Sequence, residues 1–333
     1  MGKRVAIAGA TGAVGTEFLR ILEQRSFPID RLRLLASARS VGRRLRFAGE
    51  ELPVEELTAD SFDGIDIALF SAGASRSKEF APAAVRAGAV VVDNSSAFRM
   101  EPGIPLVTPE VNAEDIEGHD GIIANPNCST IIMVVPVWPL HRANPIRRMV
   151  VSTYQAVSGA GAKAMAELEQ QARDWAAGQP VTHEALPHQA LFNVFCHDSK
   201  VGANGYNVEE SKTLHETRKM FHDETLRVTA TCVRVPVLRA HSEAINIEFA
   251  EPMPEARVRE LLAVAPGVRI VDDREGSHFP MPIEAAGGDD VLVGRIRQDI
   301  SQPDGRGIDL FVSGDQIRKG AALNAVQIAE RLL

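Results

Sequence analysis

The sequence predicts an α/β protein in which a doubly wound parallel sheet of the Rossmann type is followed by a second, α+β domain. A short apolar strand at residues 5–8 runs into a glycine turn and then into an apolar pattern with helical spacing. Further short apolar runs alternate with helical stretches as far as residue 127, which is typical of a parallel sheet covered on both faces. From residue 147 onward the strands lengthen and alternate apolar with polar residues, which favours a sheet with one covered face.

Length and charge restrict the class of protein. The chain has 333 residues, 45% of them hydrophobic and 24% charged, and such a length usually forms two domains. The net charge of -8 argues against nucleic acid or an anionic membrane surface as a partner. The apolar run at the N-terminus is too short for a signal peptide, and no window is long enough to span a bilayer. Cys128, Cys196 and Cys232 lack C-x-x-C spacing, so we expect no disulfide framework, no metal site and a cytoplasmic location.

The glycine turn at residues 9–15, GATGAVG, predicts a dinucleotide site. Glycines permit a tight turn and a close approach of the backbone, so a pyrophosphate can rest on the N–H groups at the start of the helix. The spacing is G-x-x-G-x-x-G, which is weak evidence by itself. Its position between a strand and a helix near the start of the chain strengthens the prediction.

The segment after the strand at residues 32–36 bears on the cofactor. It reads Ser37-Ala38-Arg39-Ser40 and carries no acid where an NAD enzyme would bind the ribose. An arginine with two hydroxyls suits a 2′-phosphate, so NADP is favoured over NAD. The alternative is a solvent-exposed loop arginine. Ser71 follows the apolar strand at residues 65–70, and Arg99 follows the one at 89–93, both on the edge where open α/β sheets bind ligands.

Cys128 is the candidate nucleophile. It lies in Asn125-Pro126-Asn127-Cys128-Ser129-Thr130, directly before the apolar run at residues 131–135, so we expect it where a loop enters a buried helix. Unpaired N–H groups and the positive end of the helix dipole favour thiolate over thiol at such a place. The alternative is a structural cysteine, since cysteine is among the most buried residue types.

The second half of the chain offers further polar groups at the ends of expected elements. Gln155 ends a β-rich run, and Glu209 and Lys212 are three apart on one face of a predicted helix. Arg234 and His241 bracket a bend between two strands. Structural alternatives exist for these residues. Gln155 could make a cross-strand hydrogen bond, Glu209 and Lys212 could form a surface ion pair, and His241 could be an exposed imidazole.

The C-terminus predicts a helix that packs back on the first domain. Ser313 and Gln316 form a possible capping box, and an apolar face recurs at helical spacing after them. We therefore expect an NADP-binding Rossmann domain at 1–127, a catalytic and dimerisation domain at 128–312 and the returning helix at 313–333.

Taken together, these segments resemble the aspartate-β-semialdehyde dehydrogenase family, in the family's order and over nearly the whole chain. The matching stretches are GATGAVG (9–15), SARS (37–40), DNSSAFRM (93–100), NPNCST (125–130), TYQAVSGAG (153–161), EESK (209–212), TCVRVPVLRAHSE (231–243) and KGAALNAVQIAE (319–330). NPNCST followed by the segment from Arg234 to His241 is specific, whereas the glycine turn is shared with many dehydrogenases. One departure is Asn193-Val194-Phe195-Cys196, where members often carry a proline.

The resemblance implies an NADP-dependent oxidoreductase that converts L-aspartyl 4-phosphate to L-aspartate 4-semialdehyde with release of phosphate. This is a branch-point step of amino-acid biosynthesis, toward lysine (through diaminopimelate), methionine and threonine. Members are typically homodimers through the second domain. Cys128 would form an acyl-thioester, His241 would be the acid/base catalyst, and Gln155 would position the intermediate. A thiolate step followed by hydride transfer replaces one difficult displacement by two easier steps.

The remaining site residues are assigned by the same resemblance. Arg99 and Lys212 are expected to bind phosphate, and Glu209 and Arg234 to hold the amino and carboxylate groups, with Asn127 also in the substrate site. The expected cofactor contacts are Gly9, Thr11, Gly12, Ala13, Val14, Arg39, Ser40, Ser71, Ser158, Gly159 and Gln316.

Two alternatives remain open at this point. An N-acetylglutamyl-phosphate reductase or another acyl-phosphate reductase would use the same thiol chemistry, but a carboxylate at Glu209 suits a free ammonium better than an acetamide. A non-catalytic nucleotide-binding regulator would keep the fold without turnover. The presence of Cys128, Gln155 and His241 together argues against it.

Overall fold

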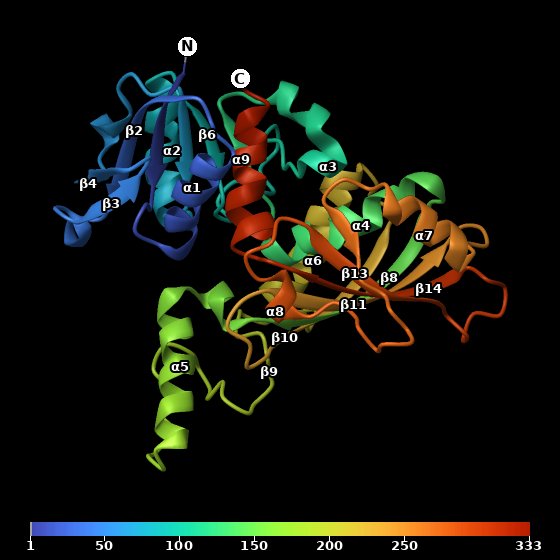
Figure 1. The fold of residues 1–333 in the computed structure, drawn as a ribbon. Helices are drawn as coiled ribbons and strands as arrows, with labels where there is room; N and C mark the ends of the chain where they lie inside the picture. Colours follow the sequence, from blue (N-terminus) through green and yellow to red (C-terminus); the bar gives the residue numbers. More distant parts are fainter. Residues whose placement is uncertain (1) are drawn as a thin grey trace. The chain divides into compact units, whose positions relative to one another are not determined.

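The computed structural model describes residues 2–333, and the chain divides into two compact units (Figure 1). The first unit runs up to Asn127 and takes in Ala321–Leu333, and the second comprises Cys128–Gly320. The predicted fold class, a Rossmann-type parallel sheet followed by a second α+β domain, is confirmed. Within residues 2–333, no helix is long and apolar enough to cross a membrane. No group of three or more potential metal ligands is found in the same part of the chain.

The first unit is built on a seven-stranded sheet in the order β3-β4-β2-β1-β5-β6-β7. All neighbouring strands are parallel except β3, which is antiparallel to β4 at one edge. The order reverses between β1 and β5, and ligands bind at such a switch point in doubly wound sheets. The strands are β1 (Lys3–Ala8), β2 (Ile29–Ala36), β3 (Arg44–Phe47), β4 (Glu50–Glu56), β5 (Ile67–Phe70), β6 (Val90–Asp93) and β7 (Ile122–Ala124).

Helices cover both faces of this sheet. Val5 and Ile7 of β1 pack with α1 and α9, whereas Ala6 and Ala8 pack with α2 on the opposite face. Alternate residues of the central strand are thus buried on both sides, which explains its continuous apolar run. The C-terminal helix α9 contacts α1, α3 and β6, so the predicted return of the chain to the first unit is confirmed (Figure 1). The helices are α1 (Ala13–Gln24), α2 (Ala74–Arg86), α3 (Pro109–Asn112) and α9 (Leu323–Glu330).

The second unit contains a mixed seven-stranded sheet in the order β12-β13-β14-β11-β8-β10-β9. Its two central strands, β8 and β11, are antiparallel, while β10 runs parallel to β8. The strands are β8 (Ile146–Gln155), β9 (Phe195–Cys196), β10 (Arg227–Arg234), β11 (His241–Phe249), β12 (Val268–Ile270), β13 (Val291–Gln298) and β14 (Gly307–Gly314).

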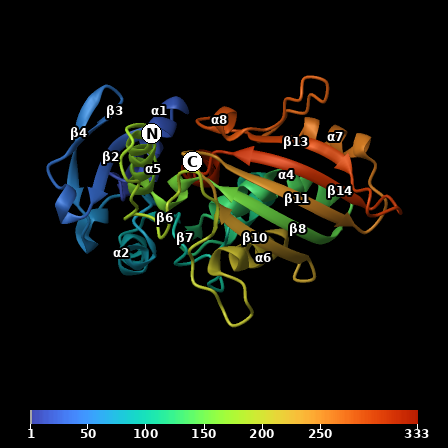
Figure 2. The same cartoon turned by 90° about the horizontal axis from the view of Figure 1, so that it is seen from below.

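Helices α4, α6 and α7 lie on one face of the second sheet (Figures 1 and 2). Helix α4 is apolar on nearly all sides because it is enclosed by the sheet and by α6 and α7. Asn207 and Glu210 form a capping box that starts α6. The helices are α4 (Cys128–Ala143), α5 (Ala162–Ala176), α6 (Val208–Phe221), α7 (Glu255–Ala263) and α8 (Pro282–Ala285).

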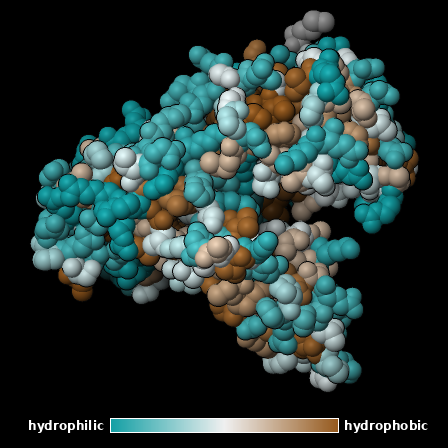
Figure 3. Space-filling model, turned by 180° about the vertical axis from the view of Figure 1, so that it is seen from behind, coloured by the Kyte–Doolittle hydropathy of each residue, from teal (hydrophilic) through white to brown (hydrophobic). Residues whose placement is uncertain are grey.

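Helix α5 projects from the second sheet together with the irregular segment that follows it (Figure 1). Hydrophobic side chains gather on this projection in Figure 3, and Trp175, Phe192 and Val194 are exposed there. The rings of Trp175 and Phe192 pack edge to face with their centroids 4.9 Å apart. Underneath, Leu168 and Leu186 belong to a small separate core that fixes the segment to the helix.

The predicted capping box of Ser313 and Gln316 is wrong. Ser313 lies within β14, where it pairs with Ser242 of β11, so no helix can begin there. The following turn is closed by Asp315 instead, whose Oδ1 accepts the N–H groups of Ile317 and Arg318. A π-helical turn at Arg318–Ala322 then leads into α9.

Candidate active site

Cys128 and His241 face each other within the second unit. Helix α4 begins at Cys128, as the apolar run after it predicts, and β11 begins at His241. Cys128 Sγ lies 3.5 Å from His241 Nε2, with the thiol half-buried and the imidazole fully buried. A thiol at the first residue of a helix lies at the positive end of the helix dipole, which favours the thiolate.

The environment of His241 fixes its protonation. Burial lowers the pKa of His241 to about 3, and the neighbouring charge of Arg234 acts in the same direction. The backbone N–H of Ala156 donates to Nδ1 at 3.0 Å, so the neutral ring carries its proton on Nε2, facing the sulfur. The ring is therefore arranged to donate a hydrogen bond toward Cys128. Taking the thiol proton would need a lone pair at Nε2, which this tautomer does not have.

Three neighbouring strands bring polar side chains to the same edge of the second sheet. Arg234 ends β10 opposite Gln155, which ends β8, and the register of β11 against β8 places His241 on the other side of Gln155. Gln155 Nε2 donates to Ser129 Oγ at 2.8 Å and to Glu209 Oε1 at 3.2 Å. The amide thus lies between the first turn of α4 and the first turn of α6. Its position at the end of a strand keeps it rigid.

Glu209 and Lys212 form a sheltered pair at the start of α6. Lys212 Nζ lies 2.9 Å from Glu209 Oε2, and the carboxylate side chain is only 6% exposed. Because Gln155 holds the other carboxylate oxygen, Glu209 is fixed from two sides. A buried carboxylate held in this way suits an ammonium ligand.

Arg234 is buried and only partly supplied with acceptors. Nη1 donates to Ala156 O at 2.9 Å and Nη2 to His197 Nε2 at 3.0 Å, while Nε is buried and donates to no other residue within 2–333. A Cβ on Gly159 would lie 3.0 Å from Arg234 Nη1 and 3.3 Å from His241 Nε2. A larger residue at this position would therefore crowd the guanidinium of Arg234 and the imidazole of His241.

Arg99 and Asn127 belong to the first unit. Arg99 is buried and its Nε donates to Asn125 O at 2.9 Å, and its Nη2 to Asn94 O at 2.8 Å. Asn324 of α9 donates to Asn125 Oδ1 at 2.7 Å, an anchor that the sequence analysis did not identify. These bonds fix the backbone that leads into Cys128.

A separate pocket of about 590 Å³ lies at the carboxyl ends of β1, β2 and β5 in the first unit. Five of the predicted cofactor residues line it, namely Gly9, Thr11, Gly12, Arg39 and Ser71. Ser40 is joined to it through a 3.3 Å hydrogen bond with Thr11, whereas Ala13 and Val14 follow as the first residues of α1. Glu56, Arg76 and Phe80 also line the pocket and were not foreseen.

The pocket fits a dinucleotide. Gly9 has φ of +91°, and a Cβ there would lie 2.3 Å from Ser71 O, so only glycine allows β1 to turn at this place. Gly12 caps α1 without a side-chain hydrogen bond and no acidic residue occupies the first turn, which leaves N–H groups for a phosphate. Arg39 and Arg76 supply cations, while the exposed Glu56 contributes the one carboxylate of the lining.

The remaining predicted cofactor residues belong to the second unit. Gln316 accepts the N–H of Ala240 on Oε1 at 2.8 Å and donates to Ser158 Oγ. Ser158 and Gly159 lie in the short helical turn Val157–Ala160 after β8, and Gly159 is beside Arg234 and His241. These three residues thus gather next to the Cys128–His241 pair and not in the pocket of the first unit.

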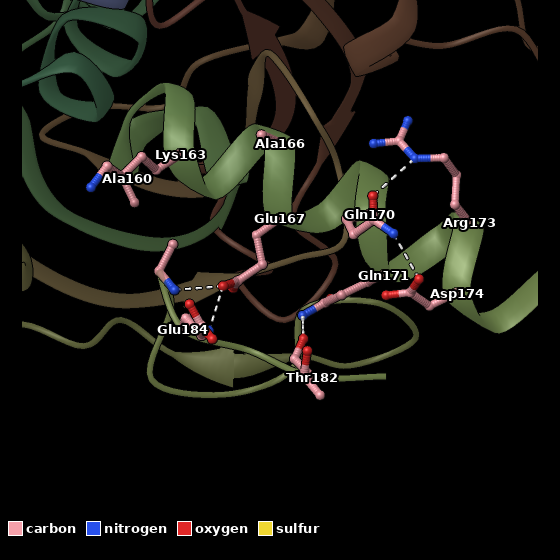
Figure 4. Close-up of a pocket in the computed structure, with 11 residues that line it drawn as sticks. Ala160, Lys163, Ala166, Glu167, Gln170, Gln171, Arg173, Asp174, Thr182 and Glu184 are labelled. Atoms are coloured by element: carbon pink, nitrogen blue, oxygen red, sulfur yellow. Dashed lines mark hydrogen bonds between the residues drawn. The ribbon is translucent and has the colours of Figure 1, made fainter. Parts of the chain in front are cut away.

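A further groove of about 880 Å³ runs along α5 (Figure 4). Most of its polar side chains bind the chain itself. Glu167 accepts the backbone N–H groups of residues 184–186, and Gln171 Nε2 donates to Thr182 O at 2.9 Å. The hydrogen bonds along this groove therefore hold the irregular segment after α5 against the helix.

Comparison with known proteins matches both units to one family. Residues 4–119 match the family model for "Semialdehyde dehydrogenase, NAD binding domain", and residues 137–319 match the one for "Semialdehyde dehydrogenase, dimerisation domain". A Synechocystis protein named aspartate-semialdehyde dehydrogenase is 58% identical over 99% of this chain and 97% of its own length. A protein of the same name from Aquifex aeolicus is 53% identical over 100% and 98%.

Comparison with solved structures points to the same family. Aspartate semialdehyde dehydrogenase II of Vibrio cholerae, complexed with ASA, has a TM-score of 0.96 at 45% identity, covering 100% of this chain and 98% of the other. The Candida albicans enzyme with NADP has a TM-score of 0.77 at 25% identity, covering 100% and 98%. The two family models and the full-length identities show that this chain belongs to the semialdehyde dehydrogenase family.

Proposed function

We propose that the protein is an aspartate-semialdehyde dehydrogenase, an oxidoreductase of amino-acid biosynthesis that converts L-aspartyl 4-phosphate to L-aspartate 4-semialdehyde and phosphate. One observation carries this proposal: the thiol of Cys128, at a helix start, lies 3.5 Å from a neutral imidazole. The names of relatives that are up to 58% identical support the substrate. We also propose a cytoplasmic location, which suits a biosynthetic enzyme like the named relatives.

The first step uses the thiolate of Cys128. The sulfur attacks the acyl carbon, a C–S bond forms, the C–O bond to the phosphoryl group breaks and phosphate leaves, so a thioester remains on Cys128. The reduced cofactor, when bound, would supply the hydride for reduction of this thioester. The resulting oxyanion then expels the thiolate as the aldehyde forms, which regenerates the sulfur for the next turnover.

His241 contributes a hydrogen bond in this scheme. Its Nε2–H faces the sulfur, so it stabilises the thiolate before attack and the negative oxygen that develops at the acyl carbon. The collapse of that oxyanion needs no proton, so the neutral ring need not ionise. Gln155, anchored by Ser129 and Glu209, is proposed to position the acyl group from the neighbouring strand.

The charged residues suit a small substrate with ionic groups at both ends. Glu209 is proposed to hold the ammonium and Arg234 the α-carboxylate, because its buried Nε–H is a donor that no residue within 2–333 accepts. Lys212, Arg99 and Asn127 are proposed to act at the phosphate end of the substrate. This charge pattern supports aspartyl phosphate over an N-acetylated relative, which has no ammonium for Glu209.

NADP is the proposed cofactor. The exposed Arg39 with Ser37 at the rim of the pocket suits a 2′-phosphate, and a relative has been solved with NADP. Gly9, Thr11, Gly12, Ala13 and Val14 would receive the pyrophosphate at the start of α1. Ser40, Ser71, Ser158, Gly159 and Gln316 complete the proposed cofactor set. A homodimer through the second unit is proposed from the match to the family's dimerisation domain.

The test is an assay in the oxidative direction, from the semialdehyde and phosphate to the acyl phosphate. Purified protein is mixed with L-aspartate semialdehyde, NADP and phosphate, and NADPH is followed by its absorbance. The proposal requires a signal that depends on all three components. Activity only with an N-acetylated semialdehyde would assign the protein to the alternative reductase, and bound NADP without any turnover would assign it to a regulator.

A further inference from the structure

One short segment contacts both residues that are proposed to hold the ionic groups of the substrate. It follows β9, which pairs antiparallel with the end of β10 so that Phe195 lies opposite Arg234. The backbone N–H of His197 donates to Cys232 O at 2.8 Å, so the register is kept beyond the strand. The segment 197–199 is thereby held beside both the end of β10 and the start of α6.

His197 contacts the guanidinium of Arg234. Its Nε2 lies 3.0 Å from Arg234 Nη2, and the carboxylate of Asp198 lies 3.8 Å from the same nitrogen. Burial lowers the pKa of His197 and outweighs the opposite effect of the Glu209 carboxylate, so the ring is neutral and Nε2 can accept from the guanidinium. With Ala156 O on Nη1, this contact fixes the rotation of the guanidinium plane.

The two ring nitrogens of His197 face competing donors. The backbone N–H of Ser199 points at Nδ1 at 3.2 Å, while Arg234 Nη2 points at Nε2. A neutral imidazole has one lone pair, so it can accept from only one of the two. Hydrogen bonds with an ionised partner are stronger, so Nε2 accepts from the guanidinium of Arg234. Nδ1 then carries the proton, and the longer contact with the N–H of Ser199 is not a hydrogen bond.

Ser199 reaches the second anchor. Its Oγ accepts the backbone N–H of Glu209 at 3.1 Å, at the first turn of α6. The segment 197–199 therefore contacts the guanidinium proposed for the substrate carboxylate and the backbone of Glu209, the residue whose side chain is proposed for the ammonium.

We propose that His197 is a positioning residue that orients Arg234 for the α-carboxylate of the substrate, and that Ser199 does the same for Glu209 and the ammonium. This inference rests on the proposed function. According to this inference, the preference for an aldehyde that carries an α-amino and an α-carboxylate group depends on the segment 197–199 as well as on Arg234 and Glu209.

The test removes one interaction from the protein and the matching group from the substrate. His197→Ala is compared with wild type on L-aspartate semialdehyde, on 4-oxobutanoate, which lacks the ammonium, and on 3-aminopropanal, which lacks the carboxylate. We expect kcat/KM to fall about tenfold for the two carboxylates, chiefly through KM, as loss of a hydrogen bond to a charged group implies. The value for 3-aminopropanal should change less than about twofold on the same reasoning.

Three further variants complete the design. His197→Gln keeps an acceptor for Arg234 and should restore most of the loss. Ser199→Ala should show the opposite substrate pattern, with its effect confined to the two substrates that carry an ammonium. His215→Ala changes an exposed histidine of α6 and should leave all three substrates unaffected.

The outcomes separate this inference from the proposed function. Equal losses on all three aldehydes, a loss in kcat with KM unchanged, or no rescue by His197→Gln would overturn the positioning role while the enzyme remains a dehydrogenase. If His197→Ala does not fold, His197→Phe, which has a similar volume but no acceptor, replaces it in the same comparison with His197→Gln on the three substrates. A wild-type protein inactive with L-aspartate semialdehyde would instead overturn the proposed function.

Discussion

Glu243 gives the sharpest prediction about stability. It lies two residues after His241 on the same face of β11, fully buried, opposite Thr153, which in turn lies opposite Cys232. Neither carboxyl oxygen of Glu243 has a hydrogen-bond partner within residues 2–333. Burial, with the nearby Glu209 carboxylate, raises the pKa of Glu243 well above its usual value, so the structure favours the uncharged acid.

The sign of the effect follows from proton linkage. Below pH 4.5 the side chain is protonated in both the folded and the unfolded chain. As pH rises, the unfolded chain loses this proton first, so the free energy of unfolding decreases by about 1.4 kcal/mol per pH unit until the raised folded pKa is reached. Glu243→Gln is isosteric and uncharged, so it lacks this contribution. The variant should match wild type near pH 4.5 and become progressively more stable than wild type at higher pH.

The measurement is urea unfolding of both proteins at pH 5, 6 and 7, at one protein concentration because the stability of the proposed dimer would depend on concentration. The difference in unfolding free energy should grow by up to about 2.7 kcal/mol over this range. Glu248→Gln, a partly buried change on the opposite face of β11, is the control and should show no such trend. A difference between Glu243→Gln and wild type that stays constant with pH would refute the reasoning.

Other predictions concern the site. Cys128→Ser should still bind the reduced cofactor, seen as enhanced NADPH fluorescence, and lose turnover, because the hydroxyl is not ionised near neutral pH; a near-normal rate would contradict the thioester route. Arg39→Ala should raise KM for NADP by about tenfold or more with little change for NAD, while Arg31→Ala, an exposed change on β2, should alter neither. Gly159→Ala should lower kcat/KM, since its Cβ would crowd Arg234 and His241, whereas Gly118→Ala has open space and should be silent in the same assay.

The positions of the key side chains were predictable where a local signal marks the end of an element. The apolar run after Cys128 predicts a helix start, and the bend between Arg234 and His241 predicts two strand ends. Parallel and antiparallel neighbours then bring such ends to one edge of a sheet, so the cluster follows once the strands pair. The glycine turn is equally local, because φ of Gly9 is a property of its own backbone.

Other features depend on pairing between distant segments and left no local signal. Glu56 reaches the nucleotide pocket because β4 pairs with β2 and sets Glu56 opposite Ala36. Asn324 anchors the loop before Cys128 from the far end of the chain. The capping box expected at Ser313 failed for the same reason, since pairing of β14 with β11 extends the strand through that position against the local preference.

The hydrogen bond from Ala156 to His241 determines which proton transfers the proposed reaction can use. A ring that both took the thiol proton and returned it would cycle through an imidazolium, which burial beside Arg234 disfavours by lowering the pKa of His241 to about 3. With the thiolate already favoured at the start of α4, the attack on the acyl carbon and the collapse of the oxyanion each proceed without a proton from the ring. The imidazole then acts by donating one hydrogen bond from Nε2, and the buried Arg234 nearby strengthens that donor without ionising it.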